Sequence, residues 1–232
     1  MKLLIERKPR TAVGFFVLKA LFVFAAIFFA AESLWAQAEG AGPSLERVSA
    51  ALAKNKVTRG NFVLERTAAN KSRALKSSGE FVIASDYGII WKTEKPIKSV
   101  QAAAKNFTVA ETASGKRTKI DGSQNPVYLQ MALLTSALWS GDLEAVQAAA
   151  EINFRSDENS WTLELFPKDQ AVQMALEKIV VEGSWKPAGA GQPLAAATSL
   201  CLRLKGGNAA CYYMSGHKYD LPLTPAELSY FD

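Results

Sequence analysis

The stretch "SSGEFVIASDYGIIWKTEKP" (residues 77–96) decides the fold, because it predicts two β-strands joined by a tight turn. Phe81 and Ile83 lie at alternate positions on the first arm, and Ile89 and Trp91 do so on the second. Alternate side chains of a strand share a face, so these four apolar side chains can point to one side of the hairpin. So much apolar surface is costly in water, and something must cover it.

The segments on either side of this hairpin add further short strands and several helices. Residues 59–66 have period two, with Phe62 and Leu64 on one face, whereas residues 44–54 place apolar side chains at helical spacings. Further helices are predicted at 126–139, at 142–150 and after 168. Further strands are predicted at 97–102, 106–112, 116–121 and near Lys178, and two more hairpins at 152–167 and 198–219. An extended tail is predicted at 220–232.

This succession of elements predicts an α+β fold with one large sheet. Successive strands at about ten-residue spacing favour an antiparallel meander over βαβ units. The sheet exceeds what a single flat layer needs, so we expect a long curved sheet or half-open barrel. Its apolar concave face needs a cover, and the helices at 44–54 and 126–139 can provide one.

Residues 1–38 have the layout of a secretory signal peptide. Five basic residues precede the apolar run "ALFVFAAIFFAA" (20–31), and "AQA" (36–38) offers the small residues at which a signal peptidase cleaves. We therefore expect cleavage after Ala38, a single domain at 39–232 and a location in the periplasm.

An uncleaved membrane anchor at 11–31 is the alternative, provided that the apolar run extends back past Lys19. Cleavage would remove five basic and two acidic residues, which lowers the net charge from +5 to +2. A charge this small offers no concentrated basic patch, and "GKRTK" (115–119) is expected to be a solvated turn, so no nucleic-acid partner is predicted.

Two cysteines flank a predicted hairpin turn. Cys201 and Cys211 lie on either side of "LRLKGGNAA", which contains Gly206 and Gly207. Residues at equal distances from such a turn lie nearly opposite each other on the paired strands. Because the protein is expected to be exported, we expect these two cysteines to form a disulfide. Two buried free thiols are the alternative. No metal site is expected, because His217 is the only histidine of the chain.

The chain offers little that could perform catalysis. His217 would need a serine and a carboxylate brought to it by the fold, and its context "SGHKY" predicts a surface histidine. The carboxylate pairs Asp157 with Glu158 and Glu164 with Asp169 lie at a turn tip and a strand end, where we expect them to be solvated. No glycine-rich phosphate loop is present. We therefore expect neither an enzyme nor a cofactor.

The remaining candidates are apolar side chains on the predicted sheet and its cover. They form either a core filled to the density of a crystal or the lining of a cavity that takes an apolar ligand, and the pattern leaves both open. As a lipid-binding set we single out Leu52, Phe62, Leu64, Phe81, Ile83, Ile89, Trp91, Met131, Leu134 and Leu138.

Several loose motifs follow one another along nearly all of the mature chain. After an N-terminal helix come "RGNFVLER" (59–66) and "LKSSGEFVIASDYGIIWKTEKP" (75–96), and later "LLTSALWSGDLEAV" (133–146) and "WTLELFPKDQAVQMALEKIVVEG" (161–183). With the ending "NAACYYMSGHKYDLPLTPAELSYF" (208–231), their order and spacing resemble the LolA-like family of periplasmic outer-membrane lipoprotein carriers.

This resemblance implies a curved antiparallel sheet forming an unclosed β-barrel covered by α-helices, with an apolar cavity for the acyl chains of lipoproteins. It implies a carrier, which we expect to be a monomer, that takes acylated lipoproteins from an inner-membrane release complex to an outer-membrane receptor. A lipid or lipoprotein sensor or docking module of the cell envelope with the same fold is the alternative, and an uncleaved anchor at 11–31 would favour it.

The motif match also assigns roles to particular segments. It places Ile89 and Trp91 on the strand that lines the cavity, and the helix at 126–139 in the lid. The resemblance further implies an arginine near the tryptophan strand that holds the lid shut. That neighbourhood reads "ASDYG" (84–88) and contains no arginine, which leaves the closing contact open.

Overall fold

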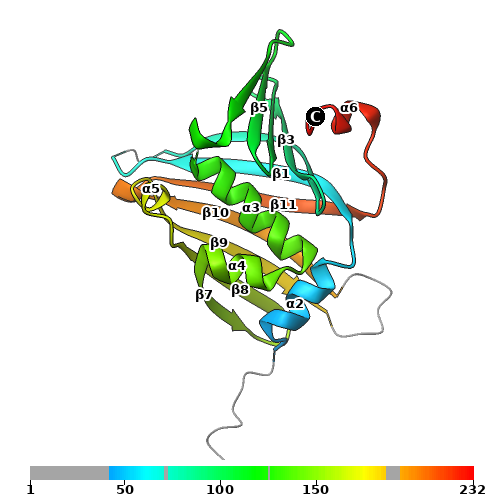
Figure 1. The fold of residues 1–232 in the computed structure, drawn as a ribbon, viewed down its shortest axis with the longest axis vertical. Coiled ribbons are helices and arrows are strands. Elements are labelled where there is room, and N and C mark those ends of the chain that lie inside the picture. The colour runs from blue at the N-terminus through cyan, green and yellow to red at the C-terminus, as the bar shows by residue number, and fades with distance from the viewer. Residues whose placement is uncertain (1–41, 71–72, 125, 187–193) are drawn as a thin grey trace, which may run out of the picture. The chain divides into compact units, whose positions relative to one another are not determined.

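The framework of the structure is an antiparallel sheet of eleven strands (Figure 1). This computed structural model describes residues 42–70, 73–124, 126–186 and 194–232, so the expected signal peptide at 1–38 lies outside the described residues. The strands are β1 Val57–Thr67, β2 Leu75–Ala84, β3 Gly88–Lys95, β4 Ser99–Ala104, β5 Phe107–Thr112, β6 Arg117–Asp121, β7 Ala150–Ser156, β8 Ser160–Pro167, β9 Leu176–Trp185, β10 Ala195–Leu204 and β11 Ala209–Tyr219. The α-helices are α2 Leu45–Leu52, α3 Pro126–Ser140, α4 Leu143–Ala149, α5 Gln170–Gln173 and α6 Pro225–Leu228.

Two meanders build the sheet. Strands β1 to β6 follow one another in one half and β7 to β11 in the other, and the pairing of β1 with β11 joins the halves. Strands β6 and β7 lie at the two edges of the sheet, so the barrel is not closed. The predicted fold class, a large antiparallel sheet in an unclosed barrel with helices over it, is confirmed.

The hairpin of β2 and β3 folds as its alternation predicts. Phe81 pairs with Trp91 and Ile83 pairs with Ile89 across the two strands. All four side chains are buried. Gly88 begins β3 with a φ of 144°, which residues with a Cβ rarely adopt, so this end of the turn requires glycine.

Helices cover the concave face of the sheet, where the main core lies. Helix α3 packs against β2, β3, β4 and β5, with α2 and α4 beside it (Figure 1). Helix α3 ends before Gly141, whose φ of 81° is typical of a helix terminus, and α4 begins at Asp142, whose carboxylate accepts a hydrogen bond from Ala145 N at 3.0 Å. Within the described ranges, no helix is long and apolar enough to cross a membrane.

The C-terminal residues pack on the convex face, which corrects the prediction of an extended tail. Thr224 begins α6 with a capping box, in which its hydroxyl accepts from Glu227 N at 3.3 Å and the Glu227 carboxylate accepts from Thr224 N at 2.9 Å. The sequence Thr-Pro-Ala-Glu is the signature of such a cap, so the signal for this helix is present in the chain. Tyr230 then joins Val82 and Ile90 in a second apolar cluster.

Glu227 fastens this C-terminal segment to the sheet. Its side chain is 4% exposed and accepts from Arg59 at 2.6 Å and Lys92 at 3.0 Å. Burial opposes the ionisation of this carboxyl, but the hydrogen bonds from Arg59, Thr224 and Lys92 outweigh it and lower its pKa from 4.5 to about 2.

Glu227→Gln should lower the free energy of unfolding at pH 7 by about 2 kcal/mol, because Arg59 and Lys92 lose their shared carboxylate. The folded-state pKa lies below the unfolded value, so the contribution of this carboxylate is complete above pH 4.5 and is lost as the pH falls from 4.5 toward 2. Urea titrations at pH 7 and pH 3 should therefore show a smaller cost of the substitution at pH 3.

Glu94→Gln is the matched control, since Glu94 is an exposed carboxylate on β3. It should leave the unfolding free energy nearly unchanged at both pH values. An equal cost of Glu227→Gln at pH 7 and pH 3 would contradict the assigned role of the Glu227 charge.

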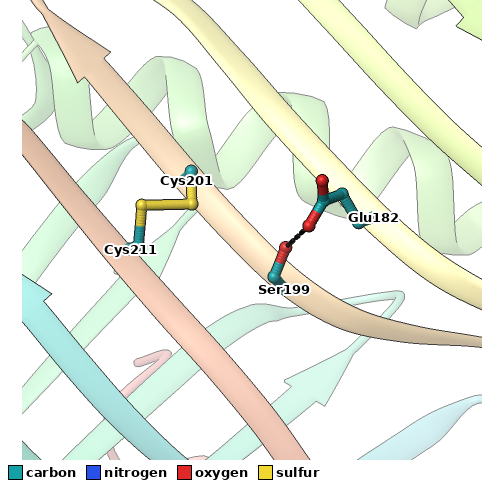
Figure 2. The surroundings of a disulfide bond; sticks show 4 residues. All are labelled: Glu182, Ser199, Cys201 and Cys211. Atoms are coloured by element: carbon teal, nitrogen blue, oxygen red, sulfur yellow. Dashed lines mark hydrogen bonds between the residues drawn. A yellow bond between two sulfur atoms is a disulfide. The ribbon is translucent and has the colours of Figure 1, made fainter.

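A disulfide joins β10 to β11 on the convex face (Figure 2). Its partners Cys201 and Cys211 pair directly across the two strands, and the next residue, Tyr212, points to the opposite face and into the main core. Beside the bond, the Ser199 hydroxyl donates to the Glu182 carboxylate at 2.8 Å. The disulfide therefore joins the two strands on the side of the sheet that faces away from α2, α3 and α4.

Candidate functional site

A pocket of about 710 Å³ opens at one end of the concave face. At that end β1 and β10 finish, β2 and β11 begin, and the first turn of α3 lies near α5 (Figure 1). Its lining residues are Arg66, Thr67, Ala68, Arg73, Leu75, Val127, Met174, Ala175, Leu202, Leu204, Lys205, Asn208, Ala209, Ala210 and Tyr212.

The alternation that fills the core also builds this pocket. Phe62 and Leu64 of β1 point into the core, so Arg66, two residues further on, lies on the same face where the strand ends. Arg66 pairs with Leu75 on one side and with Ala210 on the other. Because the alanine side chain is short, it leaves space that a larger residue would fill.

Two large apolar side chains are exposed at the mouth of the pocket. Leu75 at the start of β2 is 74% exposed, and Met174 directly after α5 is 78% exposed. Apolar groups this exposed beside a cavity are typical of a binding site. The unbranched side chain of Met174 can adapt to ligands of irregular shape.

One aromatic ring, that of Tyr212, reaches the pocket from the main core. Tyr212 lines the pocket but is only 2% exposed, and its ring stacks on that of Trp91 with centroids 4.0 Å apart. Phe62 meets the Trp91 ring edge-on at 5.2 Å. This aromatic cluster is part of the main core, and Tyr212 is its member that borders the pocket.

The ten residues that the sequence indicates as lipid-binding lie elsewhere. None of them lines this pocket, and the side chain of Met131 is outside the described residues. A cavity that borders Leu52, Phe81 and Ile83 has a volume of only about 10 Å³, room for about one water molecule. Lipid contact by the set stays a prediction. The other nine residues are at most 3% exposed and belong to the main core: Leu52, Phe62, Leu64, Phe81, Ile83, Ile89, Trp91, Leu134 and Leu138.

Sequence reasoning missed the residues at the pocket mouth. Leu75 has the same parity along β2 as Phe81 and Ile83, so the signal for its orientation was present, but Ser77 and Gly79 interrupt the apolar alternation between them. Met174 follows a helix of four residues, which is too short for a periodic pattern to mark any face.

Serine hydroxyls hold α3 in place over the sheet. The Ser136 hydroxyl donates to the Ser85 carbonyl at 2.8 Å in a buried contact, and the Ser49 hydroxyl of α2 donates to the Leu138 carbonyl at 3.3 Å. Ser85 lies in the "ASDYG" turn, the neighbourhood in which the family resemblance implied an arginine. A serine hydrogen bond therefore joins the cover to this turn.

His217 has the surroundings of a structural residue. Its Nε2 lies 2.8 Å from the carbonyl oxygen of Ala197, and the rings of Phe81 and Tyr219 flank it. Burial lowers the pKa of the imidazole, and the hydrogen bond with Ala197 partly opposes this effect. Across the described part of the chain, no group of three or more His, Cys, Asp and Glu side chains could hold a metal ion.

No family model and no curated protein matches this chain, whereas solved structures do. A DUF1329 family protein from Desulfovibrio piger is 12% identical over 81% of this chain and 94% of its own, with a TM-score of 0.46. A LolA superfamily protein from Nitrosomonas europaea is 15% identical over 77% and 93%, with a TM-score of 0.42. A domain named for outer membrane lipoprotein sorting, from Vibrio parahaemolyticus, is 11% identical over 80% and 94%, with a TM-score of 0.44.

One of these structural neighbours is named as a LolA superfamily protein, and another is named for outer membrane lipoprotein sorting. At such identities and TM-scores they assign no function to this chain. The function has to be argued from the pocket and its side chains.

Ser136→Ala should lower the free energy of unfolding by about 1 kcal/mol and speed hydrogen exchange in α3, because the buried Ser85 carbonyl loses its donor. Urea titration and hydrogen–deuterium exchange mass spectrometry measure the two effects. Ser140→Ala is the matched control, since its hydroxyl donates at 3.1 Å to Ala137 of the same helix. Equal exchange of α3 in both variants would show that the Ser136 contact does not hold the helix.

Proposed function

We propose that the pocket binds the fatty acyl chain of a lipoprotein and that the protein carries this cargo through the periplasm from the inner to the outer membrane. The observation that supports binding is a cavity of about 710 Å³ with Leu75 and Met174 exposed at its mouth. Small-molecule sites in proteins enclose roughly 300–1,000 Å³ and have mainly apolar linings, so the cavity has the size of a ligand site.

Burial of an acyl chain supplies the free energy of binding. Each methylene removed from water contributes about 0.8 kcal/mol, so about eight methylenes contribute roughly 6 kcal/mol. The cost of ordering the chain and fixing its position offsets part of this gain. The balance suits a carrier, which has to release its cargo as well as take it up.

A chain that reaches deeper than the pocket would need the space that core aromatic rings now fill. Tyr212 and Trp91 would have to move together with α3, and core residues such as Phe62 would then exchange contacts with the helix for contacts with the ligand. In this state the residues of the predicted lipid-binding set contact the chain. Because contacts with the helix are exchanged for contacts with the ligand, the net free energy of binding stays small and binding stays reversible.

Leu75→Gln combined with Met174→Gln should weaken the binding of a fluorescent 16-carbon fatty acid roughly tenfold, because the mouth loses two apolar contacts. Both side chains are exposed, so the fold should be unaffected. A fluorescence titration measures the dissociation constant. By contrast, a change at the buried Leu134 would damage the core as well as any site.

Ile97→Gln is the matched control, because Ile97 is 71% exposed and lies outside the pocket lining. It should bind the fatty acid as the wild type does. The proposal fails if the wild type does not bind the fatty acid, or if the double variant binds it as tightly as the control.

Transport through the periplasm requires a protein that diffuses freely, so it depends on removal of residues 1–38. N-terminal sequencing of the protein purified from cell envelopes should therefore begin at Glu39. A chain that retains residues 11–31 would contradict the carrier role and favour the sensor or docking module.

A further inference from the structure

We infer that the pocket selects acyl chains whose phosphate headgroup has a net negative charge and binds to Arg66, Arg73 and Lys205 at the mouth. This inference rests on the acyl-chain binding of the proposed function and extends it to a second class of ligand, phospholipids, because the acyl chains of a lipoprotein are joined through glycerol to cysteine and carry no phosphate. The inference adds a polar subsite at the mouth of a cavity with mainly apolar walls.

Three separate segments bring the cations to one place. Arg66 lies at the end of β1, Arg73 just before β2, and Lys205 directly after β10. All three residues line the pocket. The position of Lys205 is fixed by its backbone, since Lys205 N donates to the Ala175 carbonyl at 2.9 Å.

The three cations have no carboxylate partner in the part of the chain that the structure describes. Among the described residues no carboxylate oxygen lies within 4.0 Å of them, and the pocket lining contains no Asp or Glu. Other lysines nearby are paired, as in Lys76 with Glu65 and Lys178 with Glu164. Like charges gathered around one cavity repel each other, and a bound anion would relieve that repulsion.

The arrangement matches an amphiphile with one negative end. The apolar walls and the exposed Leu75 and Met174 suit a hydrocarbon chain, and cations at the mouth suit the headgroup to which the chain is attached. Arginine can donate two parallel hydrogen bonds to a phosphate, and lysine adds a point charge. A zwitterionic headgroup brings its own cation to the same mouth and therefore gains less.

Isothermal titration with two lysophospholipids of the same acyl chain, below their micelle concentrations, tests the inference. Lysophosphatidylglycerol should bind the wild type at least tenfold more tightly than lysophosphatidylcholine, and the preference should shrink at high salt, because the cations are exposed at the mouth. Inorganic phosphate alone should not bind measurably, because it gains nothing from the apolar walls.

The variant Arg66→Gln/Arg73→Gln/Lys205→Gln should bind the two lipids equally, with its affinity for lysophosphatidylcholine unchanged. The control variant carries the same change of net charge at exposed cations outside the pocket lining. It should keep the wild-type preference, which separates a local subsite from general attraction by a basic protein. Its substitutions are Lys54→Gln, Lys98→Gln and Arg203→Gln.

The outcomes separate the inference from the proposed function. Equal binding of both lipids to the wild type overturns the inference and leaves acyl-chain binding in place. Loss of the preference in the control variant, or its survival in the pocket variant, also overturns the inference. Failure of both lipids to bind the wild type overturns the proposed function itself.

Discussion

The pairing of β1 with β11 is the constraint on which the rest of the structure depends. It places Phe62 opposite Met214 and Leu64 opposite Tyr212, so the concave faces of the two meanders become one surface. The same register brings Arg66 opposite Ala210. A slip by one residue would turn every concave side chain of β1 to the convex face, removing both the core and the pocket wall.

Much of the fold could be predicted because strand alternation and turn residues are local signals. The hairpin of β2 and β3 is the clearest case, since Asp86 and Gly88 mark the turn and the apolar residues on both arms share a parity. Helix α6 was missed although its capping box, with Thr224 and Glu227, was visible in the chain. There the apolar tail residues were too few to suggest a helix, and the local cap decided the structure.

The candidate site was harder to predict for a physical reason. Side chains with strong apolar alternation, such as Phe81 and Trp91, are those that a core buries most completely, so the pattern identified packed residues. A pocket, by contrast, forms where the side chains are too small to fill the space between the elements. Here Ala210 leaves room beside Leu75, and only the pairing of distant strands shows that these residues flank Arg66. The register between strands that are far apart in the sequence cannot be predicted from a local sequence pattern.

In the structure, α2, α3 and α4 therefore lie on a filled core, and an apolar pocket opens at one end of the concave face. An acyl chain could enter there. The most direct test of this account uses stearic acid with a nitroxide at its methyl end and backbone NMR spectra of the protein. The account predicts the strongest line broadening at amides around the pocket, such as those of Leu204 and Ala210, and little in helix α6 on the convex face, such as at Glu227. Uniform broadening, or broadening strongest on the convex face, would contradict it.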